Sequence, residues 1–142
     1  MQTIKHLTLD DYDAICQVWA DSGVHFQVTG RESRQSFAQQ MASGLQTVIG
    51  IEHDGLLIGV ALATHDGRKG WINRLGVRKA NQRQGIGRLL IEEAERVLRA
   101  QGMTIIAALV EHENEASLGL FRSEGFQVND TYYLSKRDNP NV

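Results

Sequence analysis

The sequence predicts one α+β domain that uses all 142 residues, with a central mixed β-sheet flanked by helices. Three apolar segments, 48–52, 56–62 and 71–77, are joined by polar turns too short for crossovers, so we expect an antiparallel meander. An amphipathic segment over 86–100 and an apolar run over 103–110 follow. Strand, helix and strand then form a βαβ unit, which makes the run over 103–110 parallel to the strand over 71–77.

The N-terminal elements follow from local patterns in chain order. Alternation over 4–9 predicts a first strand, and helical spacing after it predicts a helix that Ser22-Gly23 ends. A second helix is expected over 32–45. The turn between the first two meander strands is Asp54-Gly55, a dipeptide typical of tight hairpins.

The C-terminal third continues the same alternation of helix and strand. The unbroken apolar run over 103–110 is typical of a strand buried on both faces. A short helix is expected over 114–124, with Gly125 at its C-terminal end. Segments 125–128 and 131–135 carry β-branched and aromatic residues and predict two closing strands.

Composition narrows the class of protein. A net charge of −2 gives no global basic field, so we expect no nucleic-acid partner. Cys16 is the only cysteine, and the five histidines show no metal-ligand spacing, so we expect neither a disulfide nor a metal. No apolar run approaches membrane-spanning length, so we expect a cytoplasmic protein with no membrane partner.

Residues 81–88 form the most informative stretch, a polar turn that feeds the amphipathic helix. Gly85 and Gly87 let the backbone approach a ligand, and a helix N-terminus offers unpaired N–H groups that suit a phosphate. Arg83 and Arg88 add cations. A plain solvated helix start fits the same pattern. Leu90 stands where a Rossmann site needs its third glycine, and Gly87-Arg88-Leu89 lacks the lysine and hydroxyl of a P-loop.

The constellation that remains spans residues 71–126. It comprises the strand over 71–77, the pattern Gln82-x-x-Gly85-x-Gly87, a helix, a buried strand, and Asn114 leading into a helix that ends at Gly125-Phe126. This arrangement resembles the GNAT superfamily of acyl-CoA-dependent N-acyltransferases. The resemblance implies acetyl-CoA as the acyl-donor cosubstrate and a fold whose parallel strands, 71–77 and 103–110, splay apart. Gly76 is the expected place of that splay.

The resemblance also implies a set of cofactor contacts. Backbone groups of the strand pair with the pantetheine arm, N–H groups of the loop hold the pyrophosphate, and Phe121 replaces the tyrosine that often protonates the departing thiolate. Phe121 has no proton to give, but it would pack against the cofactor. The implied cofactor-binding residues are Leu75, Gly76, Val77, Gln82, Arg83, Gln84, Gly85, Ile86, Gly87, Arg88, Asn114 and Phe121.

Acyl transfer to an amine needs a group that removes the ammonium proton, whose pKa is about 10. Glu111 follows the buried strand and is the candidate base, although a solvated carboxylate fits there as well. His65 and His112 are alternative bases. A thiol leaves with little protonation because its pKa is about 8.5, so the acid is Tyr132, Tyr133 or no residue.

Three functions follow from these observations. The leading hypothesis is an acetyl-CoA-dependent N-acetyltransferase, in which the primary amine of a small molecule or peptide attacks the thioester directly in a ternary complex. A non-catalytic acyl-CoA sensor is the alternative. A polyanion-binding module is the third, and its basic residues would be Arg74, Arg78, Lys79, Arg83 and Arg88. The resemblance also makes a homodimer an expectation.

Overall fold

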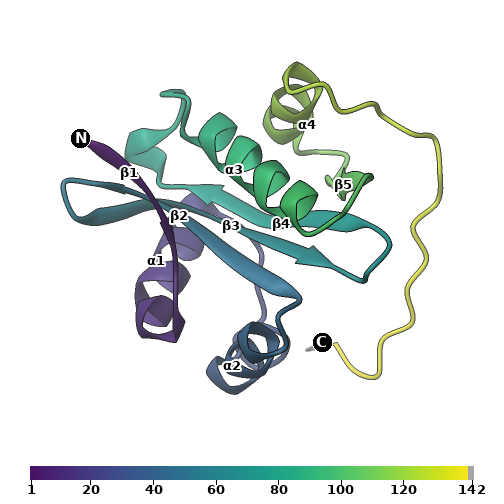
Figure 1. Cartoon of the computed structure of the whole chain (residues 1–142), viewed down its shortest axis with the longest axis horizontal. Helices are drawn as coiled ribbons and strands as arrows, with labels where there is room; N and C mark the ends of the chain where they lie inside the picture. The colour runs from purple at the N-terminus through teal and green to yellow at the C-terminus, as the bar shows by residue number, and fades with distance from the viewer. Residues whose placement is uncertain (141–142) are drawn as a thin grey trace.

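The computed structural model describes residues 1–140 and contains one five-stranded mixed sheet in the order β1-β2-β3-β4-β5 (Figure 1). β2 to β4 form the predicted antiparallel meander, and β5 runs parallel to β4, as the sequence also predicted. β1 pairs antiparallel with β2, a pairing that was not predicted from the sequence. The strands are β1 Gln2–His6, β2 Gln46–His53, β3 Leu56–His65, β4 Gly70–Val77 and β5 Ile106–Ala108.

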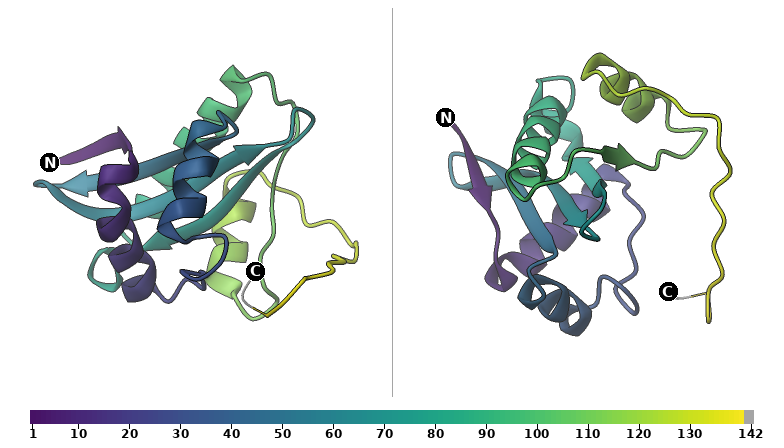
Figure 2. Two further views of the ribbon diagram at one scale, coloured as in Figure 1. Left: turned by 90° about the horizontal axis from the view of Figure 1, so that it is seen from below. Right: turned by 45° about the vertical axis from the view of Figure 1, so that its right-hand side comes forward.

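Helices cover both faces of this sheet. α1 (Tyr12–Ser22) and α2 (Arg34–Ala42) lie on one face, and α3 (Ile86–Ala100) lies on the other with α4 (Glu115–Ser123) beside it (Figure 2). Short 3₁₀ turns precede α1 and α3. Among residues 1–140, no helix is long and apolar enough to cross a membrane.

Two apolar cores result, one on each face. Trp19 and Phe37 are fully buried between α1, α2 and the sheet. On the other face, the predicted stripe of α3 is buried against β3 and β4. The contact is close at Gly59, where a Cβ would lie 2.8 Å from Ile86 Cγ2. α3 therefore holds a fixed position relative to the end of β4.

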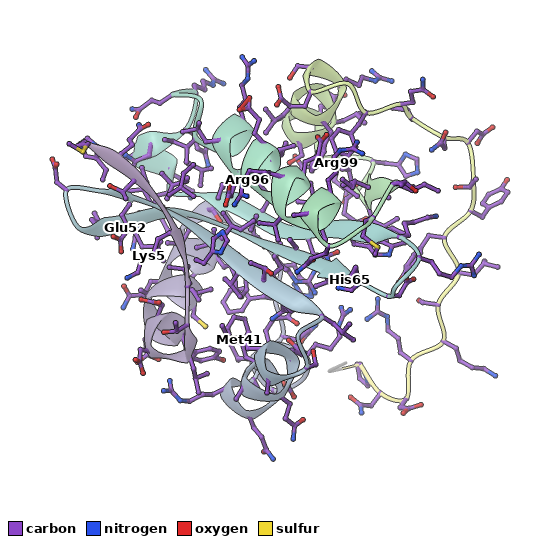
Figure 3. The ribbon with its side chains drawn as sticks, viewed as in Figure 1. Lys5, Met41, Glu52, His65, Arg96 and Arg99 are labelled. Carbon is purple, nitrogen blue, oxygen red and sulfur yellow. The ribbon has the colours of Figure 1, made fainter. Side chains whose placement is uncertain are left out.

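The hairpin between β2 and β3 has the turn that its sequence predicted. Asp54 and Gly55 both have positive φ, 51° and 84°, which is the backbone of a type I′ turn. β1 is the outer strand beside β2, and Lys5 Nζ lies 3.6 Å from Glu52 Oε2 across this pair (Figure 3). Such an ion pair favours one register of the two strands but adds little to the stability of the fold.

Glu93 is the polar residue in the apolar stripe of α3, and the structure shows why it is tolerated. Its carboxylate accepts from Arg96 Nη2 at 2.7 Å and lies 2.7 Å from His6 Nε2 on β1. The hydrogen bond from Arg96 and that from His6 lower the pKa of Glu93 to about 2. The contact between His6 and Glu93 therefore links the edge strand β1 to α3.

The irregular point of β4 lies two residues earlier than predicted. Val60 pairs with Gly76 and Leu62 pairs with Asn73, so Arg74 and Leu75 together face Ala61. Arg74 has a φ of 52°, as expected for the extra residue of a β-bulge. The expectation that Gly76 marks the splay is wrong. Gly76 is needed instead because Ser22 Oγ of α1 would lie 2.5 Å from an added Cβ.

β4 and β5 do splay, but β5 is shorter than the predicted strand over 103–110. Pairing is confined to residues 70–72 of β4 and 106–108 of β5. The prediction of burial on both faces is also wrong, because the side chains of Ile105 and Leu109 are more than half exposed. Among residues 1–140, no further strand covers the outer edge of β5. The prediction failed because an apolar run in the sequence does not specify which strands will pair with it.

The closing strands expected at 125–128 and 131–135 are absent from the described residues. Segment 127–137 is extended without strand pairing and passes around the outside of the molecule beyond β5 (Figure 1). Tyr132 and Leu134 are 96% and 87% exposed. β-propensity reflects packing on a neighbouring strand, and no neighbour is present here.

Candidate active site

The loop over 81–88 is anchored to the end of β4 by groups that precede it. Arg78 N donates to Ile58 O at 2.8 Å, and Arg78 Nε donates to Leu57 O at 2.8 Å. The side-chain amide of Gln82 then donates to Val77 O at 3.0 Å. Gln82, predicted to bind cofactor, thus has a structural bond that folds the loop back onto β4.

The backbone of this loop presents N–H groups that the protein does not use. Arg83 and Gly85 have positive φ, 63° and 83°, and Gly85 is the residue before the first turn of α3. Within residues 1–140, the backbone N–H groups of residues 83–88 donate no hydrogen bond to the protein. A Cβ at Gly85 would meet no atom within 4 Å. Unpaired N–H groups and a positive helix end facing open space make an anion-binding arrangement.

Gly87 has a different role from Gly85. A Cβ at Gly87 would lie 2.7 Å from Leu120 Cδ2 on α4. The second glycine of the pattern therefore lets α4 pack close to α3. Arg88 also links these helices, because its Nε lies 2.9 Å from Glu92 and 3.3 Å from Glu124.

The segment Leu75, Gly76 and Val77 lies where β4 has lost its parallel neighbour. Leu75 and Val77 pack on the α3 side, and Gly76 faces Ser22 of α1. Beyond Ile72, no residue in the described range pairs with the β5-facing edge of β4. An extended ligand could add to this edge as a strand does.

Asn114 and Phe121 lie on α4, and each has a protein partner. Asn114 Oδ1 accepts from Ser117 N at 3.1 Å, so the asparagine caps the helix. The carboxamide nitrogen of Asn114 stays available. Phe121 is 7% exposed and packs edge-on against Phe126, with ring centroids 5.1 Å apart. The structure places Phe121 in the core that α3 shares with α4.

The candidate base, Glu111, is exposed in the turn between β5 and α4. Its carbonyl accepts from Asn114 N at 3.0 Å. Its carboxylate has no hydrogen bond or ion pair with the rest of residues 1–140. The candidate acids, Tyr132 and Tyr133, lie in the exposed C-terminal segment.

The basic residues of the polyanion hypothesis do not form one patch. Arg74 turns toward α1 and α2, where its Nε lies 2.9 Å from Glu32 Oε1. Arg88 lies on α3, on the opposite face of the sheet, and is paired with two glutamates. Arg78 binds a backbone carbonyl. The structure therefore gives the polyanion hypothesis no continuous surface.

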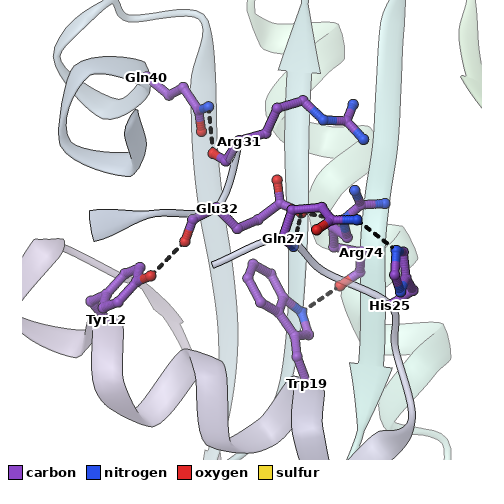
Figure 4. Close-up of polar contacts among 8 residues, drawn as sticks. All are labelled: Tyr12, Trp19, His25, Gln27, Arg31, Glu32, Gln40 and Arg74. Atoms are coloured by element: carbon purple, nitrogen blue, oxygen red, sulfur yellow. Dashed lines mark hydrogen bonds and ion pairs between the residues drawn. The ribbon is translucent and has the colours of Figure 1, made fainter. Parts of the chain in front are cut away.

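Glu32 is a candidate site residue that sequence reasoning missed. It is 4% exposed and is the one charged residue within the described range whose side chain is buried. Its Oε1 accepts from Arg74 Nε at 2.9 Å and from Gln27 N at 3.1 Å, and Trp19 Nε1 donates to Arg74 O at 2.7 Å (Figure 4). These bonds hold Arg74 in the β4 bulge. Glu32 belongs to no sequence motif and gave no signal.

A hollow of about 300 Å³ opens over this cluster. We call it the Glu32 pocket. It lies on the sheet face that α1 and α2 cover, and it is formed by the loop before α2, by α2 itself and by three neighbouring strands. Its lining residues are Arg31, Glu32, Gln40, Gln46, Leu62, Thr64, Asn73 and Arg74.

Comparison with known proteins agrees with this geometry. Residues 10–126, most of the chain, match the Acetyltransferase (GNAT) family. The chain belongs to that family. The matched range contains the loop, the free edge of β4 and the Glu32 pocket. It also contains the N-terminal helices, for which the sequence pattern carried no motif.

Relatives of this GNAT protein include bacterial acetyltransferases. An acetyltransferase of Yersinia pestis (strain Pestoides F) is 29% identical over 86 residues, and the match spans 61% of each chain. An acetyltransferase of Pectobacterium atrosepticum is 23% identical over 134 residues, 94% of each chain. The chain therefore matches under two thirds of the length of the Yersinia relatives.

Solved structures with the same fold include two that contain the cofactor. The PaiA N-acetyltransferase of Thermoplasma acidophilum, in complex with coenzyme A, has a TM-score of 0.80 at 21% identity and covers 93% of each chain. An acetyltransferase of Clostridium acetobutylicum, solved with acetyl-CoA, has a TM-score of 0.79 at 14% identity over 96% of each chain. The GNAT fold is thus shared at low identity.

Proposed function

We propose that this protein is an acetyl-CoA-dependent N-acetyltransferase that acts on a primary amine by direct attack in a ternary complex. The observation that carries the proposal is the set of unused backbone N–H groups over 83–88, which follows directly on the free edge of β4. The loop would hold the pyrophosphate. The pantetheine arm would run back along Leu75, Gly76 and Val77, so that the thioester lies toward the bulge at Arg74.

The residues present fit this cofactor in three respects. Gly85 leaves open space beside the loop, the N-terminus of α3 carries a partial positive charge, and the Asn114 carboxamide keeps two N–H donors. Bound acetyl-CoA supplies an activated acyl group, so no covalent enzyme intermediate is needed. Backbone N–H groups of residues 75–77 would polarise the thioester carbonyl.

We assign a base to the reaction but no dedicated acid. Glu111 is proposed as the base because its carboxylate is free of protein partners and lies in the turn after β5, the strand that splays away from β4. It would take the ammonium proton directly or through water. Phe121 offers no proton, and the thiolate would leave without a dedicated acid because a thiol pKa is about 8.5.

The acyl-CoA sensor remains the second candidate, and the burial of Phe121 favours it. A site without a general acid binds acyl-CoA as well as a catalytic one does. CoA release across a panel of primary amines separates the two functions. Sustained release that depends on the amine excludes the pure sensor. The homodimer stays a prediction, which light scattering of the purified protein measures.

Calorimetry with acetyl-CoA tests the proposal, with Gly85→Ala as the key variant. Alanine at a φ of 83° strains the loop and puts a methyl group where the pyrophosphate would approach. We expect affinity for acetyl-CoA to fall about tenfold or more, with about 1 kcal/mol lost in stability. Gly67→Ala is the matched control, since Gly67 has a φ of 85° in the distant turn between β3 and β4. A folded wild-type protein that binds no acetyl-CoA would end the proposal.

A further inference from the structure

We propose that the Glu32 pocket binds the acceptor, and that the acceptor is a small amine that also carries a carboxylate. This inference rests on the proposed function, because it names the substrate class of that reaction. It starts from side chains that the fold leaves without partners beside the β4 bulge. Their chemistry shows what kind of molecule would satisfy them.

The pocket has more hydrogen-bond donors than the protein uses. Gln46 Nε2 is buried and has no partner in the described chain. Arg74 donates to Glu32 through Nε alone, so its four Nη–H bonds meet no acceptor among residues 1–140. A buried donor without a partner costs free energy. Gln46 lines the pocket, so rotation of its side chain would bring Nε2 to an acceptor group of a bound molecule and remove that cost.

The charges that line the pocket indicate which ligand group would bind its unused donors. Two guanidinium groups, those of Arg31 and Arg74, line the pocket with one carboxylate, that of Glu32. Both lie on the same side of Glu32 (Figure 4). Glu32 already neutralises Arg74, so the surplus charge is positive. Planar guanidinium groups match a carboxylate by paired hydrogen bonds. A carboxylate is therefore the group that the donors would hold.

An acceptor atom for the amine also lines the pocket, on Asn73. Asn73 donates its Nδ2 to Thr64 Oγ1 at 2.9 Å, which leaves Asn73 Oδ1 without a donor in the part of the chain that the structure describes. Asn73 and Arg74 are consecutive, and Leu75 follows them directly at the edge where the pantetheine arm would pair. An amine at Asn73 would thus lie beside the thioester, with its carboxylate toward Arg31 and Gln46.

Size sets an upper limit on the molecule. A hollow of about 300 Å³ is at the small end of ligand pockets. It suits a molecule of amino-acid size. A folded protein surface would not fit, so the acceptor that we propose is a free amino carboxylate.

The test compares matched amines in the CoA-release assay with the full-length protein. Amino acids are compared with their primary amides, which keep the amine and lose the negative charge, and with amino phosphates. We expect the acids to be acetylated with a KM about tenfold lower than that of the amides, because one charge-assisted hydrogen bond is lost. Equal KM values, or a preference for the phosphates, would overturn the inference.

Variants then place the effect in the pocket. Arg31 is exposed and Gln46 Nε2 has no protein partner, so Arg31→Gln and Gln46→Met should fold normally. Each should raise the KM for the acid about tenfold while the KM for the amide and for acetyl-CoA stay unchanged. Arg68→Gln, in the turn between β3 and β4, is the control for charge. An equal rise in that control would contradict the assignment.

A binding measurement separates this inference from the proposed function. Saturation-transfer NMR detects amino acid binding to the protein without acetyl-CoA. Binding that Gln46→Met weakens supports the pocket even if acetyl-CoA is not bound, in which case only the proposed function fails. Acetyl-CoA binding and turnover that favour neutral amines would overturn the pocket assignment and leave the proposed function standing.

Discussion

The 81–88 loop and the Glu32 pocket lie at neighbouring points of β4, yet the chain builds them in different ways. The loop consists of eight consecutive residues, and its unused N–H groups belong to the backbone. The pocket collects Glu32 before α2, Gln46 on β2 and Arg74 on β4, and its unused donors belong to side chains. The loop holds its shape through backbone conformation and the bond from the Gln82 side chain to Val77 O, whereas the pocket needs the ion pair of Glu32 with Arg74.

This difference implies different sensitivities. The loop is sensitive to side-chain change at three positions: Gly85, where conformation and space are both required, Gly87, which lies against Leu120, and Gln82, whose side chain donates to Val77 O. A pocket built on a buried charge pair depends on each partner, because either one alone is left uncompensated. We therefore expect substitutions in the loop to lower the affinity for the cofactor. Substitutions of the charge pair in the pocket should lower both acceptor binding and the stability of the fold.

The largest expected effect comes from Arg74→Gln, which leaves the Glu32 carboxylate buried without its cation. We expect unfolding free energy to fall by about 3 kcal/mol, measured by urea denaturation. Adding Glu32→Gln should restore part of the loss, since the pair is coupled. Arg99→Gln removes an exposed pair with Glu95 and should cost under about 0.5 kcal/mol. An equal loss in both single variants would break the contrast between pocket and surface.

Glu111→Gln should mainly affect chemistry. Loss of a general base lowers amine-dependent turnover about a hundredfold at neutral pH, with acetyl-CoA affinity unchanged. Glu113→Gln, two residues away and also exposed, is the control. The pH–rate profile is the decisive measurement. A profile that the Glu111 substitution leaves unaltered would remove it as the base and place proton removal elsewhere.

Asn114 separates a structural role from a cofactor role. Asn114→Ala removes the cap of α4 and should cost about 1 kcal/mol of stability, whereas Asn114→Ser keeps a capping oxygen. Both variants lose the carboxamide nitrogen. If that nitrogen binds the cofactor, both should weaken acetyl-CoA binding equally, as calorimetry would show. Weakening in the alanine variant alone would mean that only the cap matters.

An effect on stability alone is expected at the contact of Glu93 with Arg96 and His6, which belongs to neither region. The pKa of Glu93 is lowered from 4.5 to about 2, so its contribution is complete above the ordinary value and is lost as pH falls toward the lowered one. Because Arg96 is exposed, we expect Glu93→Gln to cost about 1 kcal/mol near pH 6. The difference from wild type should shrink as urea denaturation is repeated at lower pH.

Most of the fold follows from local sequence patterns. Asp54-Gly55 specified its turn, the apolar stripe of α3 specified its length, and the βαβ order specified the parallel pairing of β4 with β5. The errors occur where a pattern needs a partner. The run over 103–110 and segments 125–128 and 131–135 have strand-like composition, but pairing depends on an available neighbouring edge.

The loop over 81–88 could be recognised from sequence because its glycines and helix start act through a few consecutive residues. The sequence by itself determined the family, the order of elements as far as α4 and the place of that loop. Only the tertiary structure moved the bulge from Gly76 to Arg74, assigned Gly87 to helix packing against Leu120 and brought Glu32 beside Arg74. These contacts join residues up to 42 positions apart, and no local pattern encodes which distant side chain will meet a given bulge.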